Sequence, residues 1–368
     1  MTAQTVLLDF SIDPSRIGDK VGLKDTVKLL EKGLLEFFPQ LKLIFETSTS
    51  DGHLCVFSQN DAIFLNARFF NHGIIAINIE YFKDNVEQPF VTFDKIRSLE
   101  KLLRKMLEAE RSKHFPPIKR GCRIDVYLTS SDERILEYDI DKVIYEGTSP
   151  FQKIQIVHSK SLGNMLVLDE LQNIAESDLI YTETLMQRGI ENYEGKEICI
   201  LGGGDGALLY ELLKEKPKFV TMLEIDEMVM QVCNKYLKSI CGDVLELRKS
   251  DNFEIIVDDC MIYLDKFIKE GKKFDYVFGD LTDIPISDTP TGEVWNFFRS
   301  ILEHSFKILK PTGKYLTHGN GANRPDSLSM FEEQLEKLEP KVKFTRANAF
   351  VPSFMEDWVF YQITFDDV

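Results

Sequence analysis

Apolar and polar side chains change their spacing along this chain, and the changes divide it into three regions. In the first region, apolar residues fall at helical intervals over residues 24–38 and then alternate with polar ones over residues 41–79. A second helical stretch covers residues 93–113, and Pro116 and Pro117 after it cannot continue a helix. We therefore predict an N-terminal α+β domain over residues 1–117.

The second and third regions differ in how their apolar positions are arranged. Residues 118–177 contain short alternating strands separated by turns, a pattern typical of a small antiparallel sheet. Residues 178–368 instead contain continuous apolar runs, such as the one that begins at Ile198, and these alternate with helical stretches. This alternation predicts an α/β fold, in which a small central β domain precedes a doubly wound, Rossmann-type sheet.

Composition narrows the class of partner. The formal net charge of −16 repels nucleic acid and anionic membranes and attracts cationic ligands, although many acidic proteins are merely soluble. No window is apolar enough for a membrane span, and the first residues lack the order of a signal peptide. The six cysteines have no C-x-x-C spacing, which favours reduced thiols over zinc ligands or disulfides. We expect a cytoplasmic protein.

A glycine-rich turn follows the apolar run at Ile198. Gly202, Gly204 and Ala207 occupy the G-x-G-x-x-G/A positions of a nucleotide-binding loop, where a ligand approaches the backbone. Glu224 ends the next predicted strand, at about the 20-residue offset from which a carboxylate accepts hydrogen bonds from ribose hydroxyls. Asp259, at the end of the third strand, could accept one from an adenine amino group; a solvated strand end is the alternative. The pattern predicts a nucleoside site.

Two features favour an adenosyl sulfonium over a dinucleotide as the ligand. Residues 308–316 resemble the turn before the fifth strand of the methyltransferase-like fold. Asp205 lies inside the glycine-rich turn, where its negative charge would repel the carboxylate of adenosylmethionine and attract an amine. We therefore expect a donor that has lost its carboxylate.

Asp280 ends the fourth predicted strand, at the edge of the sheet where ligands of doubly wound folds bind. An amine with a pKa of about 10 is protonated at neutral pH, so a carboxylate must take its proton before it attacks carbon. We predict that Asp280 is this proton acceptor; the alternative is that it caps the following helix. Displacement at a carbon beside a sulfonium needs neither a metal nor a resident cofactor, and we expect none.

Four short motifs resemble those of the polyamine aminopropyltransferases. They are Gly202-Gly203-Gly204-Asp205-Gly206, Ser149-Pro150-Phe151-Gln152, Ala175-Glu176-Ser177-Asp178 with Tyr181, and Asp280-Leu281-Thr282. The resemblance covers about residues 120–361 and is nearest to the spermine-forming members of the family. It implies transfer of the aminopropyl group of decarboxylated S-adenosylmethionine to spermidine, which yields spermine and 5'-methylthioadenosine.

The resemblance also implies roles for individual residues. By that resemblance, the nucleoside is held by Gln152, Gly202, Gly204, Glu224, Asp259 and Cys260, and the polyamine by Tyr181, Asp205, Asp283, Phe354 and Glu356. Phe354 stands where the spermine-forming members have tyrosine, so a phenolic hydrogen bond is lost. Asp283 is similar to the catalytic loop of the spermidine-forming members. Both departures bear on the choice of acceptor.

The first domain resembles adenosylmethionine decarboxylase in fold, and on that resemblance it pairs two subunits into a homodimer without being catalytic. Three other functions stay open: transfer to putrescine, a catalytically idle dimerising homologue, and an ordinary methyltransferase. Asp205, Glu224 and Asp280 together argue against the idle homologue, which needs none of them. The glycine loop has no neighbouring basic residue to bind a carboxylate, which argues against the methyltransferase.

Overall fold

The computed structural model describes residues 2–59, 63–83, 91–122, 124–281 and 289–366. The chain forms two compact units, Met1–Asp125 and Val126–Val368. The first unit continues past the boundary predicted at residue 117, because Ile118–Arg120 forms a strand, β7, that pairs with the first strand of the chain. From residue 126 onward, the predicted second and third regions belong to one compact unit.

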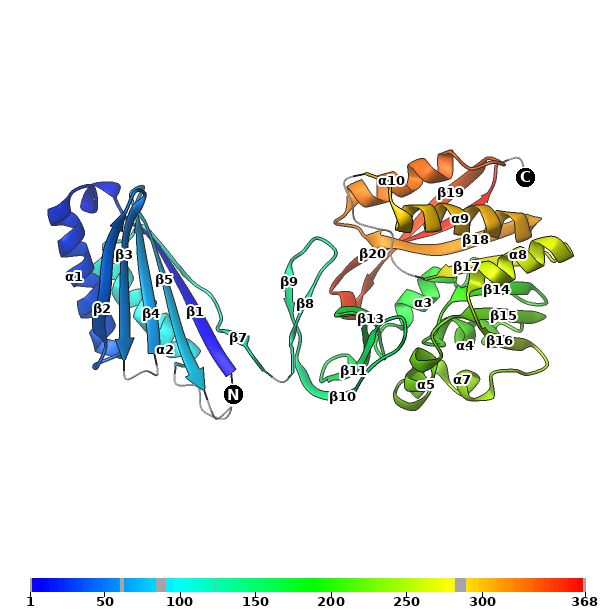
Figure 1. Ribbon diagram of the computed structural model, residues 1–368, viewed down its shortest axis with the longest axis horizontal. Coiled ribbons are helices and arrows are strands. Elements are labelled where there is room, and N and C mark those ends of the chain that lie inside the picture. The colour runs from blue at the N-terminus through cyan, green and yellow to red at the C-terminus, as the bar shows by residue number, and fades with distance from the viewer. Residues whose placement is uncertain (1, 60–62, 84–90, 123, 282–288, 367–368) are drawn as a thin grey trace. The chain divides into compact units, whose positions relative to one another are not determined.

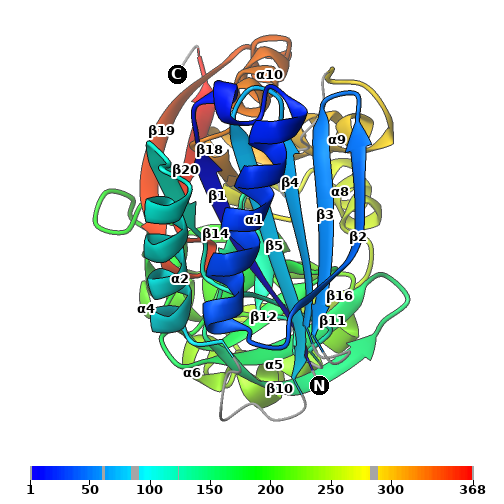
Figure 2. The ribbon, with the colours of Figure 1, turned by 90° about the vertical axis from the view of Figure 1, so that its left-hand side faces the viewer.

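The first unit is an antiparallel sheet with two helices packed on one face (Figure 2). The strand order is β2-β3-β4-β5-β1-β6, and β7 also pairs with β1. Leu65 and Ile77 are buried from one face in a cluster with Leu30 and Leu99 of the helices. Successive strand side chains point to opposite faces, so this one-sided burial produces the alternating pattern. The elements are β1 (Thr2–Ser11), η1 (Pro14–Arg16), α1 (Lys20–Phe37), β2 (Lys42–Thr49), β3 (Gly52–Gln59), β4 (Ile63–Phe70), β5 (Ile74–Lys83), α2 (Phe93–Met106), β6 (Arg111–His114) and β7 (Ile118–Arg120).

Two parts of the first unit differ from the predicted elements. The predictions do not include β1, which lies between β5 and β6 and buries Val6, Leu8 and Phe10 on one face. The helix predicted over residues 93–113 is wrong at its end, since α2 stops at Met106 and Glu108 adopts a positive φ of 51°. The following residues form β6 and pair with β1. Pairing with a neighbouring strand therefore overrode the helical pattern.

The second unit begins with a hairpin and a four-stranded antiparallel sheet. The hairpin joins β8 (Tyr127–Thr129) to β9 (Ile135–Glu137). The sheet has the order β10-β11-β12-β13 and is the small central sheet that the alternating pattern predicts. Its strands are β10 (Ile140–Thr148), β11 (Lys153–Ser159), β12 (Gly163–Leu168) and β13 (Leu171–Ala175).

A seven-stranded sheet with helices on both faces forms the rest of the second unit (Figure 1). Its order is β16-β15-β14-β17-β18-β20-β19; the first five strands are parallel, and β20 is antiparallel to both its neighbours. This is the predicted doubly wound α/β arrangement. The strands are β14 (Glu197–Gly202), β15 (Phe219–Glu224), β16 (Phe253–Val257), β17 (Phe274–Asp280), β18 (Leu309–Gly321), β19 (Val342–Val351) and β20 (Glu356–Phe365). The helices are α3 (Leu179–Leu185), α4 (Ala207–Lys214), α5 (Glu227–Tyr236), α6 (Lys238–Cys241), α7 (Val244–Leu247), α8 (Cys260–Glu270), α9 (Glu293–Ile308), α10 (Pro325–Glu336) and η2 (Pro352–Phe354).

The continuous apolar run of β14 arises because both faces of this strand are covered. Ile198 and Ile200 belong to a cluster with side chains of α4 and α5, whereas Cys199 and Leu201 belong to a second cluster with α8 and α9. Burial of each isoleucine or leucine contributes about 1.5–3 kcal/mol. The strand therefore holds its carboxyl end, where the glycine-rich turn begins, in a fixed position.

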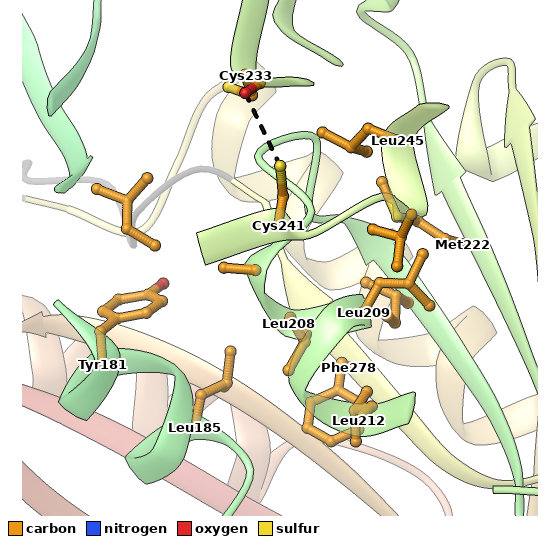
Figure 3. Packing of buried hydrophobic residues seen from close by; sticks show 14 of the residues in the cluster. Tyr181, Leu185, Leu208, Leu209, Leu212, Met222, Cys233, Cys241, Leu245 and Phe278 are labelled. Carbon is orange, nitrogen blue, oxygen red and sulfur yellow. Dashed lines mark hydrogen bonds between the residues drawn. The ribbon is translucent and has the colours of Figure 1, made fainter. Parts of the chain in front are cut away.

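Figure 3 shows the cluster on the α4 side, where Leu212 of α4 packs near Phe278 of β17. The Sγ of Cys241 lies 3.8 Å from the carbonyl oxygen of Cys233. Burial raises the pKa of the Cys241 thiol to about 12, so this thiol stays neutral. All six cysteines are free. Among the residues described, no helix combines the length and the apolar character needed to span a bilayer.

Candidate active site

The glycine-rich turn lies directly beside Asp280. The parallel pairing of β14 with β17 places Gly202 opposite Asp280 in the register, and the N–H of Gly203 donates to the Asp280 carbonyl oxygen over 3.0 Å. Gly202 has a φ of +82°, and a Cβ there would lie 2.0 Å from that oxygen. Only glycine fits this approach without displacing the backbone. The turn and the end of β17 therefore form one structural element of the site.

Glu224 ends β15 and lies against the same turn. A Cβ at Gly204 would lie 2.8 Å from Glu224 Oε2, so the glycine makes room for the carboxylate. Glu224 Oε1 accepts a hydrogen bond from the N–H of Asp226 over 2.7 Å. Burial, together with the nearby charges of Asp226 and Asp205, raises the pKa of Glu224 to about 7. Hydroxyl donors or a cation supplied by a ligand would stabilise the ionised form.

Asp205 lies within the turn, and its carboxylate accepts a hydrogen bond from the Ala207 N–H over 2.8 Å. Burial raises its pKa, and its charge acts on Glu224. Two partly desolvated carboxyls thus lie at the glycine-rich turn. Such a pair favours a ligand that brings positive charge.

Gln152 lies near these groups but is already bonded to the protein. Its side-chain amide donates to Asp226 Oδ2 over 3.0 Å, and the Ser149 hydroxyl donates to the same oxygen over 2.6 Å. Asp226 is 1% exposed and also caps α5 through the Met228 N–H. Asp226 is absent from the predicted site residues; its signal is the second acidic residue of the Glu224-Ile225-Asp226 run.

Asp259 and Cys260 follow the neighbouring strand, β16. The β15–β16 pairing places Glu224 opposite Val257, and the N–H of Asp258 donates to the Glu224 carbonyl oxygen over 3.0 Å. Asp259 caps α8 by accepting from the Met261 N–H, and Cys260 is buried at the start of that helix. Burial raises the pKa of Cys260 to about 12. The nucleoside residues predicted at the ends of β14, β15 and β16 therefore share one edge of the sheet.

Tyr181 connects this edge to a group of aromatic side chains. Its hydroxyl donates to Asp280 Oδ1 over 3.3 Å, and its ring lies edge-on to Phe354, with 5.9 Å between the ring centroids. Phe354 in turn lies 4.7 Å from the ring of Trp358. Asp280 is not the N-cap of α9, the next helix described, because Gly292 holds that position. Figure 3 shows Tyr181 of α3 as one of the residues of the buried cluster.

Glu356 is buried and is bonded to a distant part of the chain. Its two carboxylate oxygens accept from the Ser131 N–H over 2.9 Å and from the Ser131 hydroxyl over 2.8 Å. The predicted polyamine contact at Glu356 is thus occupied by protein donors. Asp283 lies outside the described residues.

Asp178 holds the segment that carries Phe354 and Glu356. Its carboxylate accepts from the Ala175 N–H over 2.7 Å and from the Ser353 N–H over 2.9 Å. Asp178 is 1% exposed, and burial raises its pKa. Sequence reasoning placed Asp178 in a family motif but assigned it no role, because its partner Ser353 is far away in the chain.

Comparison with known proteins identifies the family. The model of the spermine/spermidine synthase domain matches residues 178–367, and that of the spermidine synthase tetramerisation domain matches residues 126–176. A polyamine aminopropyltransferase of Sulfurisphaera tokodaii is 40% identical over 226 residues, which cover 60% of this chain and 71% of the relative. A thermospermine synthase of Arabidopsis thaliana is 28% identical over 236 residues, which cover 62% of this chain and 66% of the relative, just under two thirds of its length.

Solved structures agree on the fold. A spermidine synthase crystallised with the transition-state analogue AdoDATO has a TM-score of 0.55 at 22% identity, over 65% of this chain and 80% of that chain. The spermidine synthase of Thermotoga maritima has a TM-score of 0.52 at 22% identity, over 65% and 78%. The adenosylmethionine decarboxylase fold of the first domain stays a prediction. Because the first family model covers more than half of the chain, this protein belongs to the spermine/spermidine synthase family of polyamine aminopropyltransferases.

Proposed function

We propose that this protein transfers the aminopropyl group of decarboxylated S-adenosylmethionine to spermidine, giving spermine and 5'-methylthioadenosine. The observation that carries the proposal is the carboxyl group of Asp280, which lies between the glycine-rich turn and Tyr181. On one side of it are the acidic groups suited to a cationic nucleoside, and on the other are the aromatic rings suited to an alkyl chain.

The donor side supports a decarboxylated sulfonium. In support, Glu224 lies against the glycine-rich turn and Asp205 lies within it. In this proposal, Glu224 binds the ribose hydroxyls and Asp205 attracts the free amine of the donor. The carboxylate of intact adenosylmethionine would bring a further negative charge beside Asp205 and Glu224, whose own ionisation is already opposed by burial. Coulomb repulsion within this partly buried group then selects against it.

The chemical step is a direct displacement. The acceptor nitrogen forms a bond to the aminopropyl carbon, the carbon–sulfur bond breaks, and its electron pair returns to sulfur to give a neutral thioether. Asp280 takes the proton from the nitrogen, and the Tyr181 hydroxyl holds Asp280 through Oδ1. Alignment of nitrogen, carbon and sulfur supplies much of the rate, so the reaction as proposed uses no metal and no resident cofactor.

We further propose a cytoplasmic homodimer formed through the first unit. In support, the sheet face opposite the helices carries exposed Phe45 and Phe64, and apolar surface of this kind is typical of interfaces. The family model over residues 126–176 is named for tetramerisation, so a tetramer is the alternative. Sedimentation of the whole protein and of a Phe64→Asp variant tests this. A dimer that the substitution dissociates is the expected result, and an unchanged tetramer would refute it.

Putrescine is the alternative acceptor, and Asp283 is the sequence feature that favours it. The purified protein is incubated with decarboxylated adenosylmethionine that carries an isotopically labelled aminopropyl group and with equal amounts of spermidine and putrescine, and the labelled products are separated by chromatography. Separation is needed because spermine and thermospermine are isomers of equal mass. Spermine as the main product supports the proposal. Spermidine as the main product would show that putrescine is the acceptor. Thermospermine would show that spermidine reacts at its other terminal nitrogen. No product from either acceptor would support the idle homologue.

A further inference from the structure

The β8–β9 hairpin reaches the acceptor end of the site through a rigid turn. The Ser130 N–H donates to the Arg134 carbonyl oxygen over 2.9 Å, and the Ser130 hydroxyl donates to Asp132 Oδ1 over 2.6 Å. Asp132 Oδ1 also accepts from Arg134 Nε over 2.6 Å. These bonds fix the turn so that Ser131 and Arg134 face the same direction as a unit, toward Glu356.

The contact between the turn and Glu356 is tight. The side chain of Glu356 is 2% exposed, and Ser131 donates to both of its oxygens. A Cβ at Gly321 would lie 2.2 Å from the Ser131 hydroxyl and 2.6 Å from Glu356 Oε2, so the glycine leaves room for the pair. Three segments distant in the sequence therefore meet at one carboxylate.

Arg134 adds a positive charge to the same carboxylate. Its Nη2 lies 3.9 Å from Glu356 Oε2, while its side chain is 52% exposed and keeps its closer partner, Asp132. A guanidinium at this distance partly neutralises Glu356 without a direct hydrogen bond. An incoming ammonium group would meet a carboxylate that already accepts two hydrogen bonds and would be repelled by the positive charge of Arg134.

We propose that Ser131 and Arg134 set acceptor specificity by competing with the distal ammonium group of a polyamine for Glu356. This inference rests on the proposed function and gives it a specificity device. Tyr181 bonds to Asp280, and its ring contacts Phe354, two positions before Glu356, so an acceptor that reacts at Asp280 would extend along both rings to reach Glu356. A triamine has a charged nitrogen to place there, and a short diamine does not. The competition therefore weakens the binding of spermidine more than that of putrescine.

The test measures kcat and KM for spermidine and for putrescine in hairpin variants. Arg134→Gln removes the competing charge and lowers the KM for spermidine about threefold. Ser131→Ala frees Glu356 Oε2 and lowers it about fivefold. The KM for putrescine and for the donor stays unchanged in both variants. Glu356→Gln raises the KM for spermidine relative to that for putrescine. Adding Ser131→Ala to this variant has no further effect, because Ser131 acts through Glu356.

Three controls separate specificity from folding. Arg134→Lys retains the charge and keeps the wild-type preference, and Lys142→Gln removes an exposed charge on β10 without any effect on either acceptor. Thermal unfolding of each variant reports its stability. An equal change in KM for both acceptors, or a rise in the KM for spermidine in Arg134→Gln, would show that the turn only supports Glu356 and would overturn the inference.

A binding measurement keeps the inference separate from the proposed function. Titration calorimetry with spermidine or putrescine, in the presence of methylthioadenosine, gives the same ratio of affinities without turnover. If the wild type forms no aminopropylated product, the proposed function fails, and the calorimetric ratio still tests the hairpin. If the wild type turns over but no variant changes the ratio, the function stands and the inference fails.

Discussion

The proposed donor site and the proposed acceptor site both contain carboxyl groups, but these groups have different partners. At the donor site, Glu224 is buried with a pKa raised to about 7, and the neighbouring charges on Asp205 and Asp226 oppose its ionisation. At the acceptor site, Glu356 and Asp178 each accept two hydrogen bonds from the protein itself. The donor carboxyls therefore gain from a ligand, whereas Glu356 must exchange a protein partner for one and Asp178 supports the segment that carries it.

This difference bears on how each site discriminates. A group of mutually repelling carboxyls binds more tightly any ligand that supplies positive charge or hydroxyl donors, so it selects ligands by charge. A carboxylate with protein partners binds only a ligand whose cationic group displaces them, so it selects ligands by their length and by the position of that group. Asp280 lies where the two sites meet, and its substitution tests both.

The largest effect is expected for Asp280→Asn. The amide cannot take the proton of the attacking nitrogen, and loss of a general base lowers kcat by about 10³-fold. The affinity for methylthioadenosine, measured by calorimetry, stays at the wild-type value because the glycine-rich turn is intact. Asp251→Asn, at an exposed position, serves as the matched control and leaves kcat unchanged. Undiminished turnover in Asp280→Asn would remove the proton acceptor from the mechanism.

The second-largest effect is expected for Glu224→Gln, which removes a pH dependence from the free energy of unfolding. The folded pKa of about 7 exceeds the ordinary value of 4.5, so the folded protein keeps a proton that the unfolded chain has lost. Stability of the second unit therefore falls as pH rises from 4.5 to about 7 and then stays constant, a loss of about 3 kcal/mol. The glutamine variant escapes this loss and still accepts from the Asp226 N–H.

Urea denaturation of the unliganded protein at pH 5 and pH 8 checks this. Glu224→Gln should be more stable than the wild type at pH 8, with a much smaller difference at pH 5, and should bind the donor more weakly at both. Glu270→Gln, at an exposed position on α8, should match the wild type at both pH values. A variant no more stable than the wild type at pH 8 would mean that Glu224 is not strained by burial.

A third, smaller effect is expected for Asp178→Asn at the acceptor site. One of the two N–H groups, from Ala175 or Ser353, would face an amide N–H instead of a carboxylate oxygen. Leaving one buried donor without an acceptor costs about 2 kcal/mol in the free energy of unfolding. Because Ser353 precedes Phe354, the KM for the acceptor should rise while the donor KM does not. A rise in both would contradict the separation of the two sites.

The smallest effect is expected for Phe354→Tyr, which adds the phenolic hydroxyl that the family resemblance predicts for a spermine-forming enzyme. The ring already packs against Tyr181 and Trp358 and is 6% exposed, so the apolar contact is unchanged. One added hydroxyl lowers the KM for spermidine by about threefold or less. Steady-state kinetics with both acceptors measures it. A change in kcat instead of KM would indicate that the hydroxyl acts at the reacting centre instead of contacting the chain of the acceptor.

Local patterns placed the predicted nucleoside residues at one edge of the sheet because these residues follow one another at strand ends; their role stays a prediction. Parallel strands of a doubly wound sheet bring their carboxyl ends to one edge, so Gly202, Glu224 and Asp259 could be placed together from their positions in the chain. The alternating and continuous apolar runs likewise predicted the two sheet types of the second unit. They did not predict β6, where pairing with β1 decided the conformation of a segment with a helical pattern.

The amino-acid sequence by itself thus determined the doubly wound sheet, the glycine-rich turn and the family, since each depends on short-range spacing. Only the tertiary structure decided the partners of the acceptor carboxylates. Ser131 is 225 positions from Glu356, and Asp178 is 175 positions from Ser353. A hydrogen bond between such groups is set by how the hairpin and the final strands fold onto the sheet, and no local pattern of residues records it.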